Sequence, residues 1–306
     1  MKGRWERLGR ILVADGSAPW LHSHTGAAFA VPAGGSRFDV YLTARDARNR
    51  SMIGRGTLDL DRVEGGIAVE RDPVLVPGEL GGFDENGVSY PALVRAGGVL
   101  HLYYTGWMPT VLTPFQNHVG LAVQGDDGVF RRVSRAPILP RTDGDHLSTG
   151  AMFVAVEDGL WRMWYVSWTS WGTGPGDPKH TYVVKYATSE DGRHWRRDDI
   201  VCIAPELPGE HSISRPSVVR IGDTYHMWFC WRGERYRLGY AVSGDGITWE
   251  RRDAAAGLDP EPGGFDSAEI GYPHVFPHRD HLYLIYAGDD YGDAGMGLAR
   301  LPLSDL

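Results

Sequence analysis

Five carboxylates of this 306-residue chain precede short strand-like segments, and they are the residues best suited to chemistry: Asp84, Glu85, Glu210, Asp266 and Glu269. Cleavage of an acetal needs two convergent carboxyl groups, because one protonates the leaving oxygen while the other activates water or attacks the carbon. Carboxylates held close together have pKa values that are driven apart, which creates such an acid and base. These five residues are therefore predicted to be catalytic. The alternative for each is a loop cap or an Asx-turn.

A second group of residues is predicted to position a ligand. Arginine can hold a carboxylate or a phosphate through two parallel hydrogen bonds, and Arg45, Arg215 and Arg232 are candidates for this role. Alternatively, each arginine pairs with a carboxylate of the inner strands. Tryptophan can stack on a sugar face, although it also fills cores. The predicted substrate-binding residues are His24, Arg45, Asp46, Trp107, Trp168, His211, Arg215, Trp231, Asp289 and Tyr291.

No metal and no cofactor is predicted. His24, His146 and His211 could surround a metal, but no HExxH pattern supports such a site, and His22-Ser23-His24 matches a ligand motif by spelling only. No glycine-rich phosphate loop precedes a helix. No GxSxG motif indicates a serine nucleophile.

The candidate residues belong to a repeat of roughly 60 residues. Short apolar segments begin near residues 28, 91, 151, 216 and 273, and each is followed by an aromatic-rich alternating segment. Alternation over five or six residues between glycine or aspartate is typical of β-strands. Self-similarity at this period indicates a propeller or an array.

The sequence therefore predicts an all-β fold: a five-bladed β-propeller with four antiparallel strands per blade, in one domain spanning residues 1–306. Tight Asp-Gly turns recur before the fourth strand in three repeats, as in 243–249. The last repeat ends after its third strand, so residues 4–9 are predicted to complete that blade and close the ring. The alternative is two stacked β domains. In a propeller, the loops before the first strands converge at one mouth of the axis, which would bring the candidate residues together.

Eight motifs are shared with a known group of proteins: Trp20-x-x-Ser23-His24, Tyr41-x-x-x-Arg45-Asp46, Gly82-Phe83-Asp84-Glu85-x-Gly87, Tyr103-Tyr104-x-Gly106-Trp107, Trp161-Arg162-Met163-Trp164-Tyr165, Ser214-Arg215-Pro216, Asp266-Ser267 and Tyr272-Pro273. Through them, nearly the whole chain resembles the five-bladed glycoside hydrolases of families 32, 43, 62, 68 and 130. The narrower resemblance is to uncharacterised propeller proteins of glycan and natural-product biosynthesis clusters.

The resemblance implies an aspartate base or nucleophile in blade one, a modulating aspartate in blade two and a glutamate acid in blade three. Asp84 and Glu85 match blade two by position. Blade one offers Ser23 and His24 instead of a carboxylate, and blade three offers Ser148 and Thr149. The usual triad is therefore not carried over. Either the carboxylates have moved to blades two, four and five, or the reaction is not ordinary glycoside hydrolysis.

The charge and composition of the chain limit the kinds of partner that it is expected to bind. The formal net charge is −8 and no block of Lys or Arg is present, which argues against nucleic acid. No apolar run approaches the ~20 residues of a membrane span, and no signal peptide is visible. Only two cysteines occur, Cys202 and Cys230, so the cytoplasm is the expected compartment.

Three hypotheses about function remain. The first is a glycoside hydrolase-like enzyme that acts on a sugar or sugar-like small molecule by carboxylate acid/base chemistry. The second is a biosynthetic cyclase, lyase or isomerase on the same scaffold, which the missing blade-one carboxylate favours. The third is a non-catalytic glycan-binding propeller.

Overall fold

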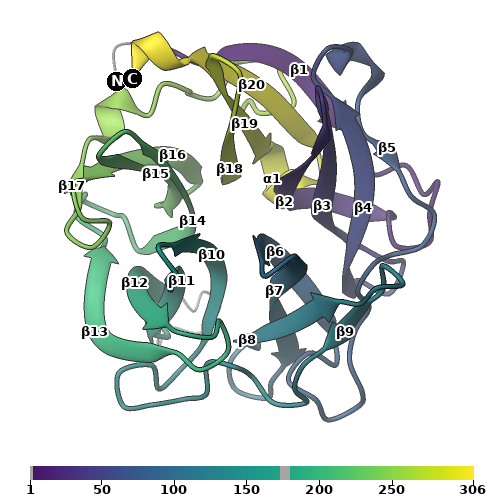
Figure 1. Cartoon of the computed structure of the whole chain (residues 1–306), viewed down its shortest axis with the longest axis vertical. Coiled ribbons are helices and arrows are strands. Elements are labelled where there is room, and N and C mark those ends of the chain that lie inside the picture. The colour runs from purple at the N-terminus through teal and green to yellow at the C-terminus, as the bar shows by residue number, and fades with distance from the viewer. Residues whose placement is uncertain (1–2, 173–179) are drawn as a thin grey trace.

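The computed structural model describes residues 3–172 and 180–306 (Figure 1). Nearly all of its regular structure is β-strand, which confirms the predicted all-β class. The strands are β1 (Glu6–Leu12), β2 (Ser23–Gly34), β3 (Arg37–Arg45), β4 (Ser51–Asp59), β5 (Ala68–Val69), β6 (Gly87–Ala96), β7 (Val99–Pro109), β8 (Phe115–Gln124), β9 (Phe130–Arg132), β10 (Thr149–Glu157), β11 (Leu160–Ser170), β12 (Thr181–Ser189), β13 (Arg196–Ile203), β14 (Ser212–Ile221), β15 (Thr224–Arg232), β16 (Tyr236–Ser243), β17 (Glu250–Arg251), β18 (Gly271–His278), β19 (His281–Ala287) and β20 (Met296–Pro302). Short helical segments lie in connections: α1 (Asp289–Gly292), η1 (Val63–Gly65), η2 (Asp253–Ala255) and η3 (Leu303–Asp305). In the part of the chain that is described, no helix has the length and apolar character needed to cross a bilayer.

Consecutive strands pair antiparallel in four-stranded meanders: β2 to β5, β6 to β9, β10 to β13 and β14 to β17. The remaining sheet has the order β1-β20-β19-β18, so the first strand of the chain pairs with the last one. Its register runs from Glu6 opposite Arg300 to Leu12 opposite Met296. The pairing of β1 therefore joins the two ends of the described chain in one sheet.

The first strand of each meander lies nearest the centre of the molecule (Figure 1). These inner strands are β2, β6, β10, β14 and β18, and each contacts the next, with β18 contacting β2. The sheets extend outward from them (Figure 1). The loops and strand ends at one mouth of this arrangement position the candidate residues.

The Asp-Gly turns of one meander pack against aromatic residues of the preceding meander. Gly192 and Gly246 have φ values of 72° and 75°, a left-handed conformation that glycine adopts without strain. The carbonyl of Gly192 accepts a hydrogen bond from the Tyr103 hydroxyl at 2.6 Å, and that of Gly246 accepts one from Trp164 Nε1 at 2.7 Å. Both aromatic side chains are buried, so these bonds satisfy their polar atoms while the rings fill the core between sheets.

Every inner strand carries a β-bulge near its start. Each pairs irregularly with its neighbour at this point. The bulge residues are Ala27, Tyr90, Ala151, Arg215 and Tyr272, and none is glycine although all have φ between 43° and 53°. A bulge interrupts the alternation of side chains and re-aims one of them. The five bulge residues therefore lie at equivalent positions beside the axis.

Candidate functional site

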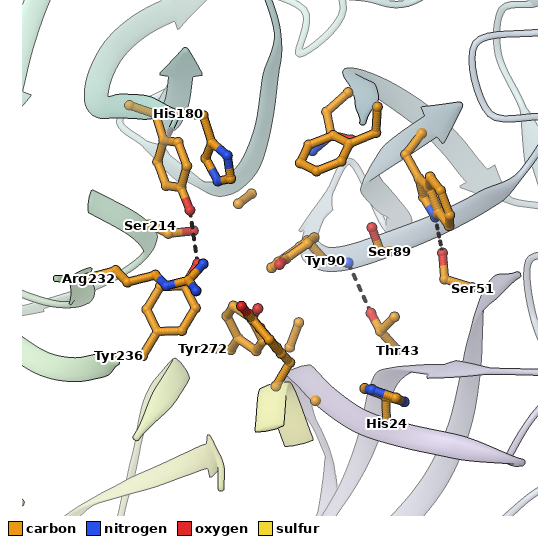
Figure 2. Close-up of a pocket in the computed structure, with 18 of the residues that line it drawn as sticks. His24, Thr43, Ser51, Ser89, Tyr90, His180, Ser214, Arg232, Tyr236 and Tyr272 are labelled. Atoms are coloured by element: carbon orange, nitrogen blue, oxygen red, sulfur yellow. Dashed lines mark hydrogen bonds between the residues drawn. The ribbon is translucent and has the colours of Figure 1, made fainter. Parts of the chain in front are cut away.

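A cavity of about 490 Å³ lies among the inner strands and the ends of the strands that follow them (Figure 2). Four of the five bulge residues line it: Ala27, Tyr90, Ala151 and Tyr272. Non-glycine residues in the left-handed region are uncommon, and they cluster where function demands an otherwise unfavourable backbone. The bulges thus turn side chains of ordinary strands into lining of the cavity.

Five tyrosines line this cavity, and four of them, Tyr90, Tyr182, Tyr236 and Tyr272, form two close pairs. The rings of Tyr90 and Tyr272 meet edge to face, with centroids 5.3 Å apart. The hydroxyls of Tyr182 and Tyr236 are hydrogen-bonded at 2.9 Å. Burial raises the pKa of all four hydroxyls, so they are neutral proton donors near pH 7. Tyr90 extends toward the middle of the cavity (Figure 2).

Two arginines line the cavity and have no carboxylate partner among the described residues. Arg45 Nη1 donates a hydrogen bond to Asn49 Oδ1 at 3.0 Å. The guanidinium of Arg232 stacks on the rings of Tyr236 and Tyr291, 5.4 Å from each centroid. Arg232 Nε is buried and finds no acceptor among the described residues. No aspartate or glutamate is among the described residues that line the cavity. The lining is therefore cationic and matches an anionic group.

A third arginine lies beside the cavity, buried on the axis. Arg215 is 2% exposed, and its Nη2 donates to the carbonyl oxygens of Ala28 in β2 and Pro91 in β6, at 2.8 and 2.9 Å. Its Nη1 has no partner among the described residues. Burial lowers the pKa of this guanidinium to about 10, which still leaves it charged at pH 7. Arg215 thus ties β14 to two other inner strands and adds positive charge next to Tyr90.

His24 is the titratable group of the lining best placed to accept a proton. Its Nδ1 lies 2.9 Å from Ser23 Oγ and 3.5 Å from a carboxylate oxygen of Asp293. Burial and the charge of Arg45 lower its pKa, although Asp293 opposes that shift. The imidazole is therefore neutral near pH 7. Nε2 has no hydrogen-bond partner within the described chain, so this nitrogen is available to a ligand as a donor or an acceptor, depending on the tautomer.

Aromatic rings form another part of the wall. Trp107 Nε1 donates to Ser51 Oγ at 2.6 Å, which fixes the indole (Figure 2). The rings of Trp168 and Tyr182 lie 4.6 Å apart, and Phe115 meets Trp168 edge to face at 6.4 Å. Flat apolar faces next to fixed polar groups suit a sugar ring or an aromatic ligand.

The structure brings together five of the predicted substrate-binding residues in the cavity lining: His24, Arg45, Trp107, Trp168 and Tyr291. It places the other five outside the lining: Asp46, His211, Arg215, Trp231 and Asp289. Asp46 accepts hydrogen bonds from the backbone and side chain of Arg50 in a turn. Asp289 accepts from the backbone amides of Ala268 and Glu269. His211 Nε2 contacts the carbonyl of Gly233 at 2.9 Å.

None of the five predicted catalytic carboxylates lines the cavity. Asp84 accepts a hydrogen bond from Tyr104 at 3.1 Å and pairs with Arg132 at 2.8 Å. Asp145, which is not among the predicted site residues, binds Tyr165 and Arg197 in the same manner, each at 2.9 Å.

The same pattern recurs further along the chain. Asp266 binds Tyr286 and Arg7, both at 3.0 Å. Glu210 pairs with Arg251 at 2.9 Å, and the Arg251 guanidinium lies over the ring of Phe229. Each carboxylate joins the loop before a first strand to the fourth strand of the same sheet, so its geometry fits the structural alternative.

The remaining two predicted carboxylates bind backbone amides. Glu85 accepts from the Gly81 amide at 2.7 Å. Glu269 is 3% exposed and accepts from the Tyr291 amide at 2.7 Å. Because Tyr291 lines the cavity, Glu269 supports the wall without reaching the ligand space.

Sequence reasoning missed most of the polar lining: Thr43, Ser51, Ser89, Tyr90, Asn117, His180, Tyr182, Ser214, Tyr236 and Tyr272. A partial signal was present in the Tyr-Pro and Arg-Pro pairs that open three inner strands, which mark three of the five bulges. Among the described residues, no three His, Cys, Asp or Glu side chains come together in a way that could hold a metal ion.

No protein family model matches the chain. The uncharacterized protein Rv1502 of Mycobacterium tuberculosis (strain H37Rv) is 41% identical over 300 residues, 97% of this chain and 99% of that protein. A 1,2-beta-oligomannan phosphorylase of Thermoanaerobacter sp. (strain X514) is 24% identical over 170 residues, 52% of this chain and 57% of that one.

Solved structures extend the similarity. One described as a glycoside hydrolase superposes with a TM-score of 0.75 at 17% identity, covering 97% of this chain and 92% of that one. Another structure, from work on the GH130 family of mannoside phosphorylases, superposes with a TM-score of 0.74 at 16% identity. The match covers 99% of this chain and 95% of that one. The fold is thus that of the propeller glycoside hydrolases. Within that fold, the chain belongs to the same family as Rv1502.

Proposed function

We propose that this protein transfers a glycosyl group between a glycoside and inorganic phosphate in the axial cavity. One observation carries the proposal: two guanidinium groups, Arg45 and Arg232, line a cavity whose described lining contains no carboxylate. Hydrolysis needs a second carboxylate to activate water or to attack the sugar. Phosphate is itself the nucleophile, so phosphorolysis needs only a proton donor and a site for the anion.

The proposed step balances as follows. A phosphate oxygen bonds to the anomeric carbon while the bond from that carbon to the glycosidic oxygen breaks. The Tyr90 hydroxyl gives its proton to the departing oxygen, and the proton of hydrogen phosphate restores the hydroxyl. Arg45 and Arg232 hold the phosphate, and the buried charge of Arg215 stabilises the transient phenolate.

The comparisons support this proposal. The sequence relative from Thermoanaerobacter is named as a phosphorylase, and one solved neighbour comes from a study of mannoside phosphorylases. We also propose that the five inner strands belong to five blades of a single domain that β1 closes, as the contact of β18 with β2 supports. Cys202 and Cys230 are free thiols, which fits a reducing compartment.

Phosphate dependence tests the proposal. Purified protein is incubated with nitrophenyl glycosides and β-1,2-linked mannosides, with and without phosphate, and sugar phosphate is measured. We expect product only with phosphate. Replacing Arg45 or Arg232 by Met should raise the KM for phosphate about tenfold or more, because a charged hydrogen bond contributes about 1.5–3 kcal/mol. Tyr90→Phe should lower kcat with little change in that KM. Turnover that ignores phosphate would overturn the proposal, as would saturable sugar binding without any turnover, which indicates a binding module.

A second candidate is elimination or isomerisation of an anionic sugar in a biosynthetic pathway. The neutral imidazole of His24 favours it, because a base beside the positive charge of Arg45 can remove a proton next to a carboxylate. Such a reaction would proceed without phosphate and be abolished in His24→Gln. The same incubations with uronic acids therefore separate the two candidates.

A further inference from the structure

A hairpin of unusual composition rises from the rim of the cavity. Residues 107–115 comprise the end of β7, the turn 110–114 and the first residue of β8, and they contain no charged side chain. At the tip, Val111 is 98% exposed and Leu112 is 96% exposed. Turns normally carry Gly, Asn, Asp, Ser or Pro, and water contact with large aliphatic side chains is unfavourable. Two aliphatic residues side by side at a tip therefore require an explanation.

The tip is held in shape by hydroxyl groups. Thr110 Oγ1 donates a hydrogen bond to the carbonyl of Thr113, and the two threonine Oγ1 atoms lie 2.7 Å apart. These bonds close the turn from the inside, so Val111 and Leu112 point away from it. The apolar tip is thus presented by a defined turn.

The two feet of the hairpin are part of the cavity lining. Phe115, at one foot of the hairpin, lines the cavity. Its ring centroid lies 5.3 Å from that of Trp171 and 6.4 Å from that of Trp168. Trp107, at the other foot, also lines the cavity. Within residues 107–115, a ligand that leaves the cavity along these rings meets no charged side chain before the tip.

We propose that this hairpin binds an alkyl or prenyl chain attached to the ligand whose polar head occupies the cavity. The proposal rests on the proposed function in taking the head to be a sugar or phosphate near Arg45 and Arg232. The substrate class is then an amphiphile: an anionic or phosphate-accepting sugar with an apolar tail. The aromatic residues at the feet of the hairpin contact the part of the alkyl tail next to the polar head. Val111 and Leu112 contact the far end of that tail.

Two other occupants fit the hairpin less well. A second copy of the chain would need about 800 Å² from each partner for a stable interface, far more than two side chains supply. An anionic bilayer surface would repel a chain with a net charge of −8. The tip is small enough for a single hydrocarbon chain.

The proposal is tested by measuring the affinity of the full-length protein for three ligands. These are methyl phosphate, decyl phosphate (below its micelle concentration) and inorganic phosphate. Decyl phosphate should bind at least tenfold tighter than methyl phosphate, the effect of burying about two methylene groups. The double variant Val111→Ser/Leu112→Ser should lose this gain and keep its affinity for methyl phosphate. Both side chains are almost fully exposed, so the fold should tolerate the change.

Leu80→Ser is the matched control, because Leu80 is 95% exposed and lies outside the cavity lining. It should retain the chain-length gain. The proposal is overturned if decyl and methyl phosphate bind alike, if the gain survives the double variant, or if Leu80→Ser removes it equally. Vesicle binding or dimerisation lost in the double variant, without a chain-length gain, would assign the tip to those occupants. Loss of inorganic phosphate binding alone would instead count against the proposed function.

Discussion

The arginines of this protein fall into two groups with different consequences. Arg132 and Arg197 pair with buried carboxylates, so their charges are compensated within the fold. Arg45, Arg215 and Arg232 have no carboxylate within ion-pair distance in the described chain. Burying an uncompensated charge is unfavourable. A ligand anion would supply the missing compensation, which makes the second group the basis of function and the first a basis of stability.

His24 should titrate below its usual pH range, and two substitutions should move it in opposite directions. Arg45→Met removes a repelling positive charge, so the pKa of His24 should rise. Asp293→Asn removes an attracting negative charge, so the pKa should fall. Histidine ring signals followed by NMR across pH 4 to 8 measure both shifts. Equal or absent shifts would contradict the assigned surroundings of His24.

Asp145 should contribute strongly to stability above pH 4. Burial opposes its ionisation, but hydrogen bonds from Ser167 and Tyr165 and the charges of Lys185 and Arg197 lower its pKa. Asp145→Asn should cost about 3–5 kcal/mol at pH 7, because the buried Arg197 loses its carboxylate partner and Lys185 loses one of two. A lowered carboxyl pKa stabilises the fold above the unfolded value near 3.8 and stops doing so as the pH falls through the folded value.

Urea unfolding at several pH values measures this effect. The difference between wild type and Asp145→Asn should be largest near neutrality and shrink below pH 4. Asp199 also pairs with Lys185, but its side chain is 63% exposed, so Asp199→Asn should cost less than about 1 kcal/mol. Equal losses for the two variants would contradict the distinction between a buried and an exposed pair.

At the scale of elements, the bulges of the inner strands create the lining of the cavity. A left-handed conformation costs a non-glycine residue about 1–2 kcal/mol. Ala151→Gly, at φ 43°, should therefore increase the free energy of unfolding by about 0.5–1 kcal/mol after the entropy cost of glycine. Ala155→Gly, in regular β10, should decrease it by a similar amount. Chemical denaturation of both variants measures the contrast, and a loss at both sites would argue against strain at the bulge.

The sequence was sufficient to predict the strands, because alternation and Asp-Gly turns are local properties. It also located the loops from which five lining residues come, including His24 and Arg45. It could not separate a catalytic carboxylate from a paired one. The partner of Asp84 is 48 residues away and that of Asp266 is 259 residues away, so no local pattern shows them. The bulges were only partly visible: Tyr-Pro and Arg-Pro pairs mark three of them, but a tyrosine in an apolar segment is also typical of a core.

At the scale of the molecule, the N-terminal strand is bound in two ways. β1 pairs with β20 along its length, and Arg7 of β1 binds the buried Asp266. The amide of Gly3 also donates to the carbonyl of Asp305 at 3.2 Å. The proposed closure of the ring thus depends on contacts between residues at opposite ends of the described chain.

A disulfide across this junction should stabilise the protein. A Cβ atom on Gly3 would lie 2.7 Å from that of Asp305, so a small shift of the terminal segment brings a Gly3→Cys/Asp305→Cys pair to the ~3.8 Å that a disulfide needs. Because the bond would close a very long loop, we expect about 2–4 kcal/mol of added stability in the oxidised form. Thermal unfolding with and without reductant measures the gain, and no difference between the two forms would contradict a ring held at this junction.

Arg215 has a consequence for how the inner strands are held together. Its guanidinium bonds to Ala28 of β2 and Pro91 of β6, which are 187 and 124 positions away in the sequence. Met152 and His274 beside the axis are also buried. A single substitution at Arg215 should therefore loosen three inner strands at once.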